Sequence, residues 1–143
     1  AMGYGVPSGI AAKVALPKKF VVSVSGDGCF LMNGQEIATA IQYNLKILFI
    51  VFDNGMYGTI RMHQERDYPE HVYGTDLVNP DFAALARAYG LYAETIRSTE
   101  EIRDSVARCI EQDVASLIHI KVDPEAITTR TTLASIRKKA LSR

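Results

Sequence analysis

Apolar and β-branched residues gather in short runs along the chain, and stretches with helical spacing lie between the runs. Runs of this length and composition predict buried strands, and the stretches between them predict helices. The predicted strands are residues 20–25, 46–53, 92–96 and 117–122, and the predicted helices are residues 8–16, 34–43, 81–89 and about 98–112. Strands alternating with helices predict an α/β fold, a doubly wound parallel sheet with helices on both faces.

Residues that favour helix ends support two of these helices. Asn33 with Glu36 three positions later has the form of a capping box, so we predict that Asn33 caps the helix that follows. Asn79 is predicted to cap the next helix, with Pro80 at its first position and Gly90 closing it.

Two segments lack clean periodicity. Residues 54–79 hold glycines, a proline, charges and tyrosines, and we predict a long loop that is either functional or disordered. Residues 125–143 are basic near their end, where we expect a short helix or an extended arm with Arg137, Lys138 and Lys139 in solvent. His119 alternates with apolar residues on the last predicted strand, and we assign it no role.

Size and composition narrow the classes of function. A chain of 143 residues predicts a single domain, residues 1–143. The zero formal net charge argues against broad attraction to nucleic acid or membrane, and no apolar run approaches the ~20 residues of a membrane span. Cys29 and Cys109 lack a CxxC spacing, which favours reduced thiols and a cytoplasmic setting over one disulfide. The apolar, glycine-rich start, residues 1–7, suggests a fragment of a longer polypeptide.

Polar clusters follow two of the predicted strands directly. Gly26-Asp27-Gly28 ends the first, and Asp53-Asn54-Gly55 ends the second. Ligands of parallel sheets bind beyond the carboxyl ends of strands, so a carboxylate and a carboxamide are expected side by side there. Such oxygens suit Mg²⁺, which keeps positions open for phosphates. Either triplet alone is typical of a plain turn, and that interpretation stays open beside the metal site.

A family resemblance rests on these clusters. The run GDGCFLMNGQEIATAIQYNLKILFIVFDNGMYGTIRMHQE, residues 26–65, resembles the thiamine diphosphate motif of the decarboxylase and acetohydroxyacid synthase superfamily. The upstream run MGYGVPSGIAAKVA is similar to the segment beneath the cofactor in that family. The resemblance covers residues 1 to about 96, and 117–124 fits as the closing strand. Acetolactate synthase-like and benzoylformate decarboxylase-like enzymes are the most similar, in their C-terminal diphosphate-binding domain.

The resemblance implies a role for particular residues. Asp27 and Asn54 match the two side-chain Mg²⁺ ligands, and Met56 stands where a main-chain carbonyl is the third. Met2 matches a bulky apolar residue that bends the cofactor. The other implied cofactor contacts are Gly26, Gly28, Cys29, Tyr57 and Gly58.

Two positions depart from the family pattern. Asp53 stands where the family commonly has asparagine, and we expect it either to pair with a cation such as Arg61 or to weaken diphosphate binding by repulsion. Cys29 replaces a common serine, which we expect to cost a hydrogen bond of ~1 kcal/mol.

The resemblance also implies what lies elsewhere. The family's catalytic glutamate belongs to a pyrimidine-binding domain of the same or another subunit, so we expect no catalytic residue in this chain. The implied parent is an Mg²⁺- and thiamine diphosphate-dependent decarboxylase or carboligase, a lyase or transferase that acts on a small 2-oxo acid. It would be a homo-oligomer, a dimer or tetramer, whereas the isolated domain would be inactive.

A receiver-like signalling module without catalytic activity is the alternative, because it too places an aspartate at a strand end beside Mg²⁺. It requires further acidic residues at a neighbouring strand end and a lysine on a later strand. The first strand is followed by glycines, and we identify no such lysine where the last strand ends at Val122-Asp123-Pro124.

Overall fold

The computed structural model describes residues 1–142, which form two compact units. The first unit combines residues 1–53 with 79–121, and the second combines residues 54–78 with the chain from 122 onward. No helix among the described residues has both the length and the apolar character needed to cross a membrane.

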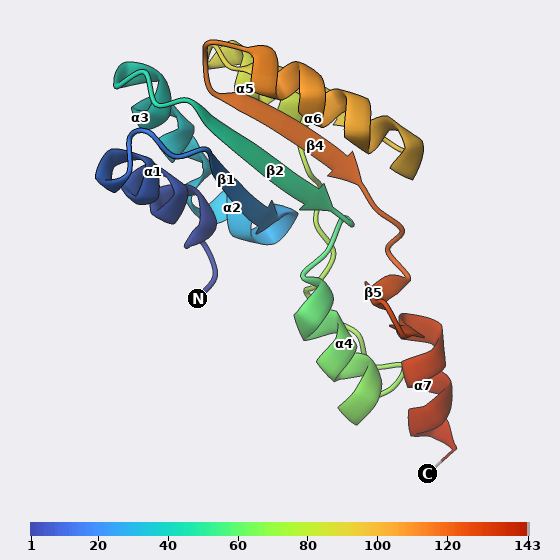
Figure 1. Cartoon of the computed structure of the whole chain (residues 1–143). Helices are drawn as coiled ribbons and strands as arrows, with labels where there is room; N and C mark the ends of the chain where they lie inside the picture. Colours follow the sequence, from blue (N-terminus) through green and yellow to red (C-terminus); the bar gives the residue numbers. More distant parts are fainter. Residues whose placement is uncertain (143) are drawn as a thin grey trace. The chain divides into compact units, whose positions relative to one another are not determined.

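A parallel sheet of four strands organises the first unit, in the order β1-β2-β4-β3 (Figure 1). The strands are β1 (Val21–Gly26), β2 (Ile47–Asp53), β3 (Tyr92–Ile96) and β4 (Ser116–Lys121). Val21 pairs with Ile47, and Phe49 pairs with Leu117, so the carboxyl ends of the strands meet at one edge. The predicted strands and the α/β parallel sheet are confirmed.

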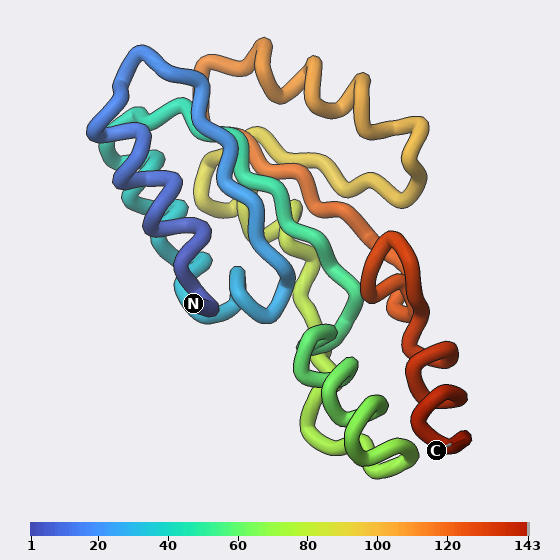
Figure 2. The backbone as a smooth tube through the Cα atoms, turned by 60° about the horizontal axis from the view of Figure 1, so that its bottom comes forward, coloured from blue at the N-terminus to red at the C-terminus, as the bar shows by residue number. Residues whose placement is uncertain are grey.

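Helices cover both faces of this sheet, as Figures 1 and 2 show. The first face is the one to which Phe49 and Val51 point, and the core there also holds Phe30 and Phe82, whose rings meet edge to face at 5.2 Å between centroids. The helices of this face are α1 (Gly5–Ala15), α2 (Asp27–Asn33), α3 (Ile37–Gln42) and α5 (Phe82–Ala88). Short 3₁₀ helices, η1 (Gly34–Glu36) and η2 (Thr99–Glu101), precede α3 and α6.

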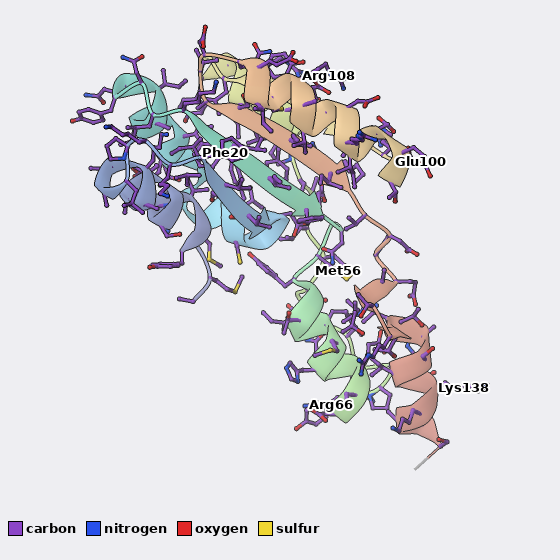
Figure 3. The ribbon with its side chains drawn as sticks, viewed as in Figure 1. Phe20, Met56, Arg66, Glu100, Arg108 and Lys138 are labelled. Carbon is purple, nitrogen blue, oxygen red and sulfur yellow. The ribbon has the colours of Figure 1, made fainter. Side chains whose placement is uncertain are left out.

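The second face is covered by α6 (Ile102–Glu111), which packs against β3 and β4. Ser116 Oγ donates to the Cys109 carbonyl oxygen at 3.2 Å. Over β1 and the end of β2 the same face is open, and the apolar side chains of Val22, Val24 and Phe52 are exposed. Figure 3 shows Arg108 and Glu100 on α6 and η2, and Phe20 before β1.

The helix after β1 starts earlier than predicted. It begins at Asp27 and ends at Asn33, which also stands at the N-cap position of η1 but makes no side-chain cap hydrogen bond there. The Asn33 side chain instead donates to the Gly3 carbonyl oxygen at 3.0 Å, and Glu36 accepts from the hydroxyl of Thr39. The predicted capping box is therefore wrong, because tertiary and neighbouring side-chain contacts engage both residues.

The cap of α5 also differs from the prediction. Asp81 caps this helix, with Oδ1 accepting from the Ala84 N–H at 3.0 Å. Gly90 has φ of +93° after the helix, and the Leu91 N–H donates to the Ala86 carbonyl oxygen at 3.1 Å. This is a Schellman motif, so Gly90 closes the helix as predicted. Asn79 is not the cap, because its side chain is bound to two carboxylates at the strand ends.

The second unit contains a helix where a loop was predicted. Its elements are α4 (Gly58–Asp67), β5 (Ala126–Thr128), β6 (Thr131–Thr132) and α7 (Leu133–Leu141). Helices α4 and α7 pack together, and Figure 3 labels Arg66 and Lys138 on them. The buried residue of α4 is Glu65, which binds Arg61 and Arg137. Because a charge network replaces an apolar stripe, hydrophobic periodicity gave no signal for α4.

Candidate functional site

Two carboxylates lie next to each other where β1 and β2 end. Gly26 pairs with Phe52 in the sheet, so Asp27 and Asp53 follow from neighbouring strand ends. Their side chains are buried, at 3% and 4% exposure. The Asn79 amide joins them, because Nδ2 donates to Asp27 Oδ2 and to Asp53 Oδ1, each at 2.8 Å. Burial and shared bonding distinguish this pair from two plain surface turns.

Asp27 is oriented by its own backbone as well. Its Oδ1 accepts from the Gly28 N–H at 2.8 Å, and the residue occupies the first turn of α2, where the helix dipole favours a negative charge. A Cβ placed on Gly26 would meet no atom within 4 Å. The backbone before Asp27 is thus unobstructed within the first unit, which suits the approach of a phosphate group.

Asp53 carries a charge that the first unit balances. His119 Nε2 lies 2.8 Å from Asp53 Oδ2, and Lys121 Nζ donates to the same oxygen. Burial raises the pKa of Asp53, but hydrogen bonds from Lys121, His119 and Asn79 outweigh it and hold the pKa well below 3.8. The expected pairing of Asp53 with a cation is present, but the cation is Lys121, whereas Arg61 binds Glu65 and Asp76.

Sequence reasoning missed three members of this cluster. They are Asn79, His119 and Lys121. His119 is 1% exposed and its ring meets Phe82 edge to face at 5.1 Å. The sequence does indicate that His119 and Lys121 lie on the same face of the sheet, because they alternate with isoleucines on a buried strand and alternate residues of a strand share a face. The register of β4 with β2 places Lys121 opposite Asp53.

A pocket of about 280 Å³ opens beside this cluster, at the ends of β3 and β4. Its lining includes Thr95, Arg97, His119 and Lys121. His119 Nδ1 makes no hydrogen bond among the described residues and lies 3.7 Å from Asp81 Oδ1. Groups of both charges therefore line the pocket.

Four of the predicted site residues belong to the second unit. Asn54 Oδ1 accepts from the Met56 N–H at 3.1 Å, and a Cβ on Gly58 would stand 2.8 Å from Asn54 Nδ2. The Tyr57 N–H donates to the Thr75 carbonyl oxygen at 2.8 Å. Figure 3 labels Met56 where the chain leads into α4. The unit thus brings Asn54, Met56, Tyr57 and Gly58 together.

The remaining predicted residues belong to the first unit. Gly26, Asp27, Gly28 and Cys29 are consecutive at the start of α2, and Cys29 is half-buried. Met2 is 45% exposed in the turn that leads to α1. Among the described residues, no group of three or more His, Cys, Asp or Glu side chains has the arrangement of a metal centre. Any cation here would need amide, carbonyl or ligand oxygens beside Asp27.

Comparison with known proteins identifies a family and several relatives of this chain. Residues 1–120 match the model of the family "Thiamine pyrophosphate enzyme, C-terminal TPP binding domain". The chain is 39% identical over 124 residues to a probable acetolactate synthase large subunit of Methanocaldococcus jannaschii, covering 86% of the chain and 21% of the relative.

Two further relatives have related names. The chain is 34% identical over 123 residues to the large subunit of acetolactate synthase isozyme 2 of Escherichia coli, covering 85% of the chain and 22% of the relative. It is 36% identical over 134 residues to 3D-(3,5/4)-trihydroxycyclohexane-1,2-dione hydrolase of Bacillus subtilis, covering 89% of the chain and 21% of the relative. The chain therefore spans about a fifth of the length of these curated relatives.

Proposed function

This chain belongs to the thiamine pyrophosphate enzyme family, as its C-terminal TPP-binding domain, and from that premise we propose that it anchors thiamine diphosphate through Mg²⁺. The parent would be a 2-oxo acid decarboxylase or carboligase resembling acetolactate synthase. The observation that carries the metal proposal is the carboxylate of Asp27 at the strand ends, which is buried and accepts hydrogen bonds on both of its oxygens.

Asp27, the side-chain oxygen of Asn54 and the carbonyl oxygen of Met56 are the proposed metal ligands. All three are hard oxygen donors, and only one is charged, which leaves the remaining positions for diphosphate oxygens and water. Asn54 follows Asp53 directly in the chain. We therefore propose that the two compact units act as one thiamine diphosphate-binding domain.

The proposed cofactor contacts begin with the backbone at Gly26, Gly28 and Cys29, which would hold the diphosphate. Met2 would support the bent cofactor, and Tyr57 and Gly58 would line the loop after the metal. Thiamine diphosphate supplies the electron sink for cleaving a bond next to a carbonyl group. The share of this chain is to bind and orient that cofactor and to exclude water from it.

The rest of the catalytic machinery is proposed to lie outside the chain. A pyrimidine-binding domain of the same or another subunit would supply the glutamate, in a homo-oligomeric cytoplasmic enzyme. The chain alone would then show no decarboxylation or carboligation above background. Turnover by the pure chain would contradict this division of roles.

Titration of the chain with thiamine diphosphate tests the proposal. Isothermal titration calorimetry should detect binding with Mg²⁺ present and none after chelation, and Asp27→Ala should abolish the Mg²⁺-dependent part. Asp104→Ala is the matched control, because Asp104 is an exposed carboxylate on α6. Binding that ignores the metal, or that survives in Asp27→Ala, would refute the metal assignment.

The family match does not favour a receiver-like module, although one contact resembles what such a module requires. A lysine stands on a later strand: Lys121 ends β4 and binds Asp53, beside the carboxylate of Asp27. Strand-end carboxylates and a lysine are what such a module requires, whereas the family match opposes it. Labelling of either aspartate by a small phosphodonor such as acetyl phosphate would favour the module.

A further inference from the structure

Two buried carboxylates next to each other repel unless cations or hydrogen-bond donors separate them. Asp53 has Lys121 as a cationic partner, and the ring of His119, which also contacts Asp53, adds a second positive charge only when it is protonated. The Asn79 side chain donates to both carboxylates. A single amide nitrogen has two hydrogens, so Nδ2 donates one to each carboxylate.

Hydrogen bonds to both oxygens of Asp27 fix the plane of its carboxylate. The Gly28 N–H holds Oδ1, and the Asn79 side chain holds Oδ2, both at 2.8 Å. Rotation of the group about its terminal torsion would break both bonds together. A carboxylate fixed in this way presents its remaining lone pairs in set directions, which suits a cation of strict geometry better than one of flexible geometry.

This restriction matters for the identity of the metal. Mg²⁺ requires near-ideal octahedral geometry and binds through one carboxylate oxygen, whereas Ca²⁺ accepts both oxygens of a carboxylate in flexible geometry. Residues that hold a ligand in place change metal affinity by about 10–100-fold when they are mutated. The bond from Asn79 is therefore placed where it can affect both affinity and selectivity.

We propose that Asn79 is a positioning residue of the metal site: it holds the Asp27 carboxylate in a fixed orientation and ties it to Asp53, whose charge is balanced. This inference rests on the proposed Mg²⁺-thiamine diphosphate function. It also accounts for an aspartate at position 53, because a carboxylate engaged by Asn79, His119 and Lys121 does not compete with Asp27 for the cation.

Metal selectivity of the chain tests this role. The affinities for Mg²⁺ and Ca²⁺ are measured calorimetrically with saturating thiamine diphosphate, in the wild-type chain and in Asn79→Ala. The expected result is a loss of Mg²⁺ affinity of about 10-fold or more with a smaller loss for Ca²⁺, so that the ratio of the two falls. Electron paramagnetic resonance of bound Mn²⁺ should show a broadened, less uniform site in the variant.

The matched control is Asp81→Ala, which removes the cap of α5 in the same segment and leaves the bonds from Asn79 to both carboxylates in place. Its ratio of Mg²⁺ to Ca²⁺ affinity should equal that of the wild type. An unchanged ratio in Asn79→Ala, or an equal fall in both variants, would overturn the inference.

A second variant guards against misfolding. Asn79→Ser keeps one donor hydrogen and can hold only one carboxylate. Its ratio of Mg²⁺ to Ca²⁺ affinity should therefore fall between those of the wild type and Asn79→Ala, and a wild-type ratio would count against the inference.

Failure of the proposed function and failure of the role of Asn79 give different results. A wild-type chain without Mg²⁺-dependent binding would remove the proposed function and this role with it, whereas normal wild-type binding with unchanged variants would remove this role alone.

Discussion

Arg137 and Glu65 lie 72 residues apart in the sequence and form a two-point ion pair in the second unit. Arg137 Nε donates to Glu65 Oε2 at 2.6 Å, and Nη2 donates to Oε1. Glu65 is fully buried, and Arg61 Nε also donates to it at 3.0 Å. The expectation that Arg137 is a solvated end residue is thus wrong, because this side chain neutralises a buried carboxylate.

Loss of the arginine should destabilise the chain. We expect Arg137→Met to lower the free energy of unfolding by about 1–2 kcal/mol, since Arg61 remains to bind Glu65 and Arg137 is partly exposed. Chemical denaturation followed by circular dichroism measures the effect. Lys138→Met is the control, because Lys138 is the exposed next residue, and its change should stay within about 0.5 kcal/mol. Equal effects of the two variants would show that the ion pair adds no stability.

Acid should weaken the first unit through Glu94. Paired hydrogen bonds from Arg108, at 2.7 and 2.6 Å, lower the pKa of Glu94 from 4.5 to about 2. A depressed carboxyl pKa gives stability that is complete above 4.5 and is lost as the pH falls from 4.5 to about 2. Glu94→Gln should therefore lose stability at pH 7 and show a flatter decline between these pH values. Parallel curves for variant and wild type would contradict this assignment.

The two thiols should react at different rates. Burial raises the pKa of Cys109 to about 11, and the residue is 3% exposed, whereas Cys29 is half-buried. At pH 8 we expect a thiol reagent to label Cys29 first and Cys109 only on unfolding, because the thiolate is the reactive form. Thiamine diphosphate with Mg²⁺ should slow labelling of Cys29 if that residue contacts the diphosphate. Mass spectrometry of the labelled peptides, with and without cofactor, identifies each site.

Asp53 should matter more for stability than for cofactor binding. Asp53→Asn leaves Lys121 and His119 without their carboxylate, and we expect a loss of about 1–3 kcal/mol in the free energy of unfolding. Thiamine diphosphate affinity should change by less than about threefold, since the charge of Asp53 is already balanced. A large gain in affinity would instead support the repulsion that the sequence suggested. Denaturation and calorimetry on the same preparation separate the two effects.

Much of the first unit could be predicted because its signals are local. The runs that end at Gly26 and Asp53 are continuous and apolar, as strands buried in a parallel sheet are, and Gly90 has the positive φ that closes a helix. The position of Asp27 at a strand end followed from the same pattern, and the structure adds that its side chain is buried.

The remainder depended on contacts between distant residues. Asn79 had the sequence context of a cap, but two carboxylates 52 and 26 residues away in the chain bind its side chain. Helix α4 has no apolar pattern that would predict it, because its buried residue, Glu65, is charged and is neutralised by Arg137 of α7. Local propensity carries no information about either partner, so tertiary contacts overrode it.

The middle of the sheet joins strands that lie far apart in the sequence. Asp53 and Lys121, opposite each other at the end of the β2–β4 pairing, are 68 residues apart. A pairing of this separation must close a long loop before its contacts form, which slows folding relative to helices and hairpins. We therefore expect refolding from denaturant on the scale of milliseconds to seconds.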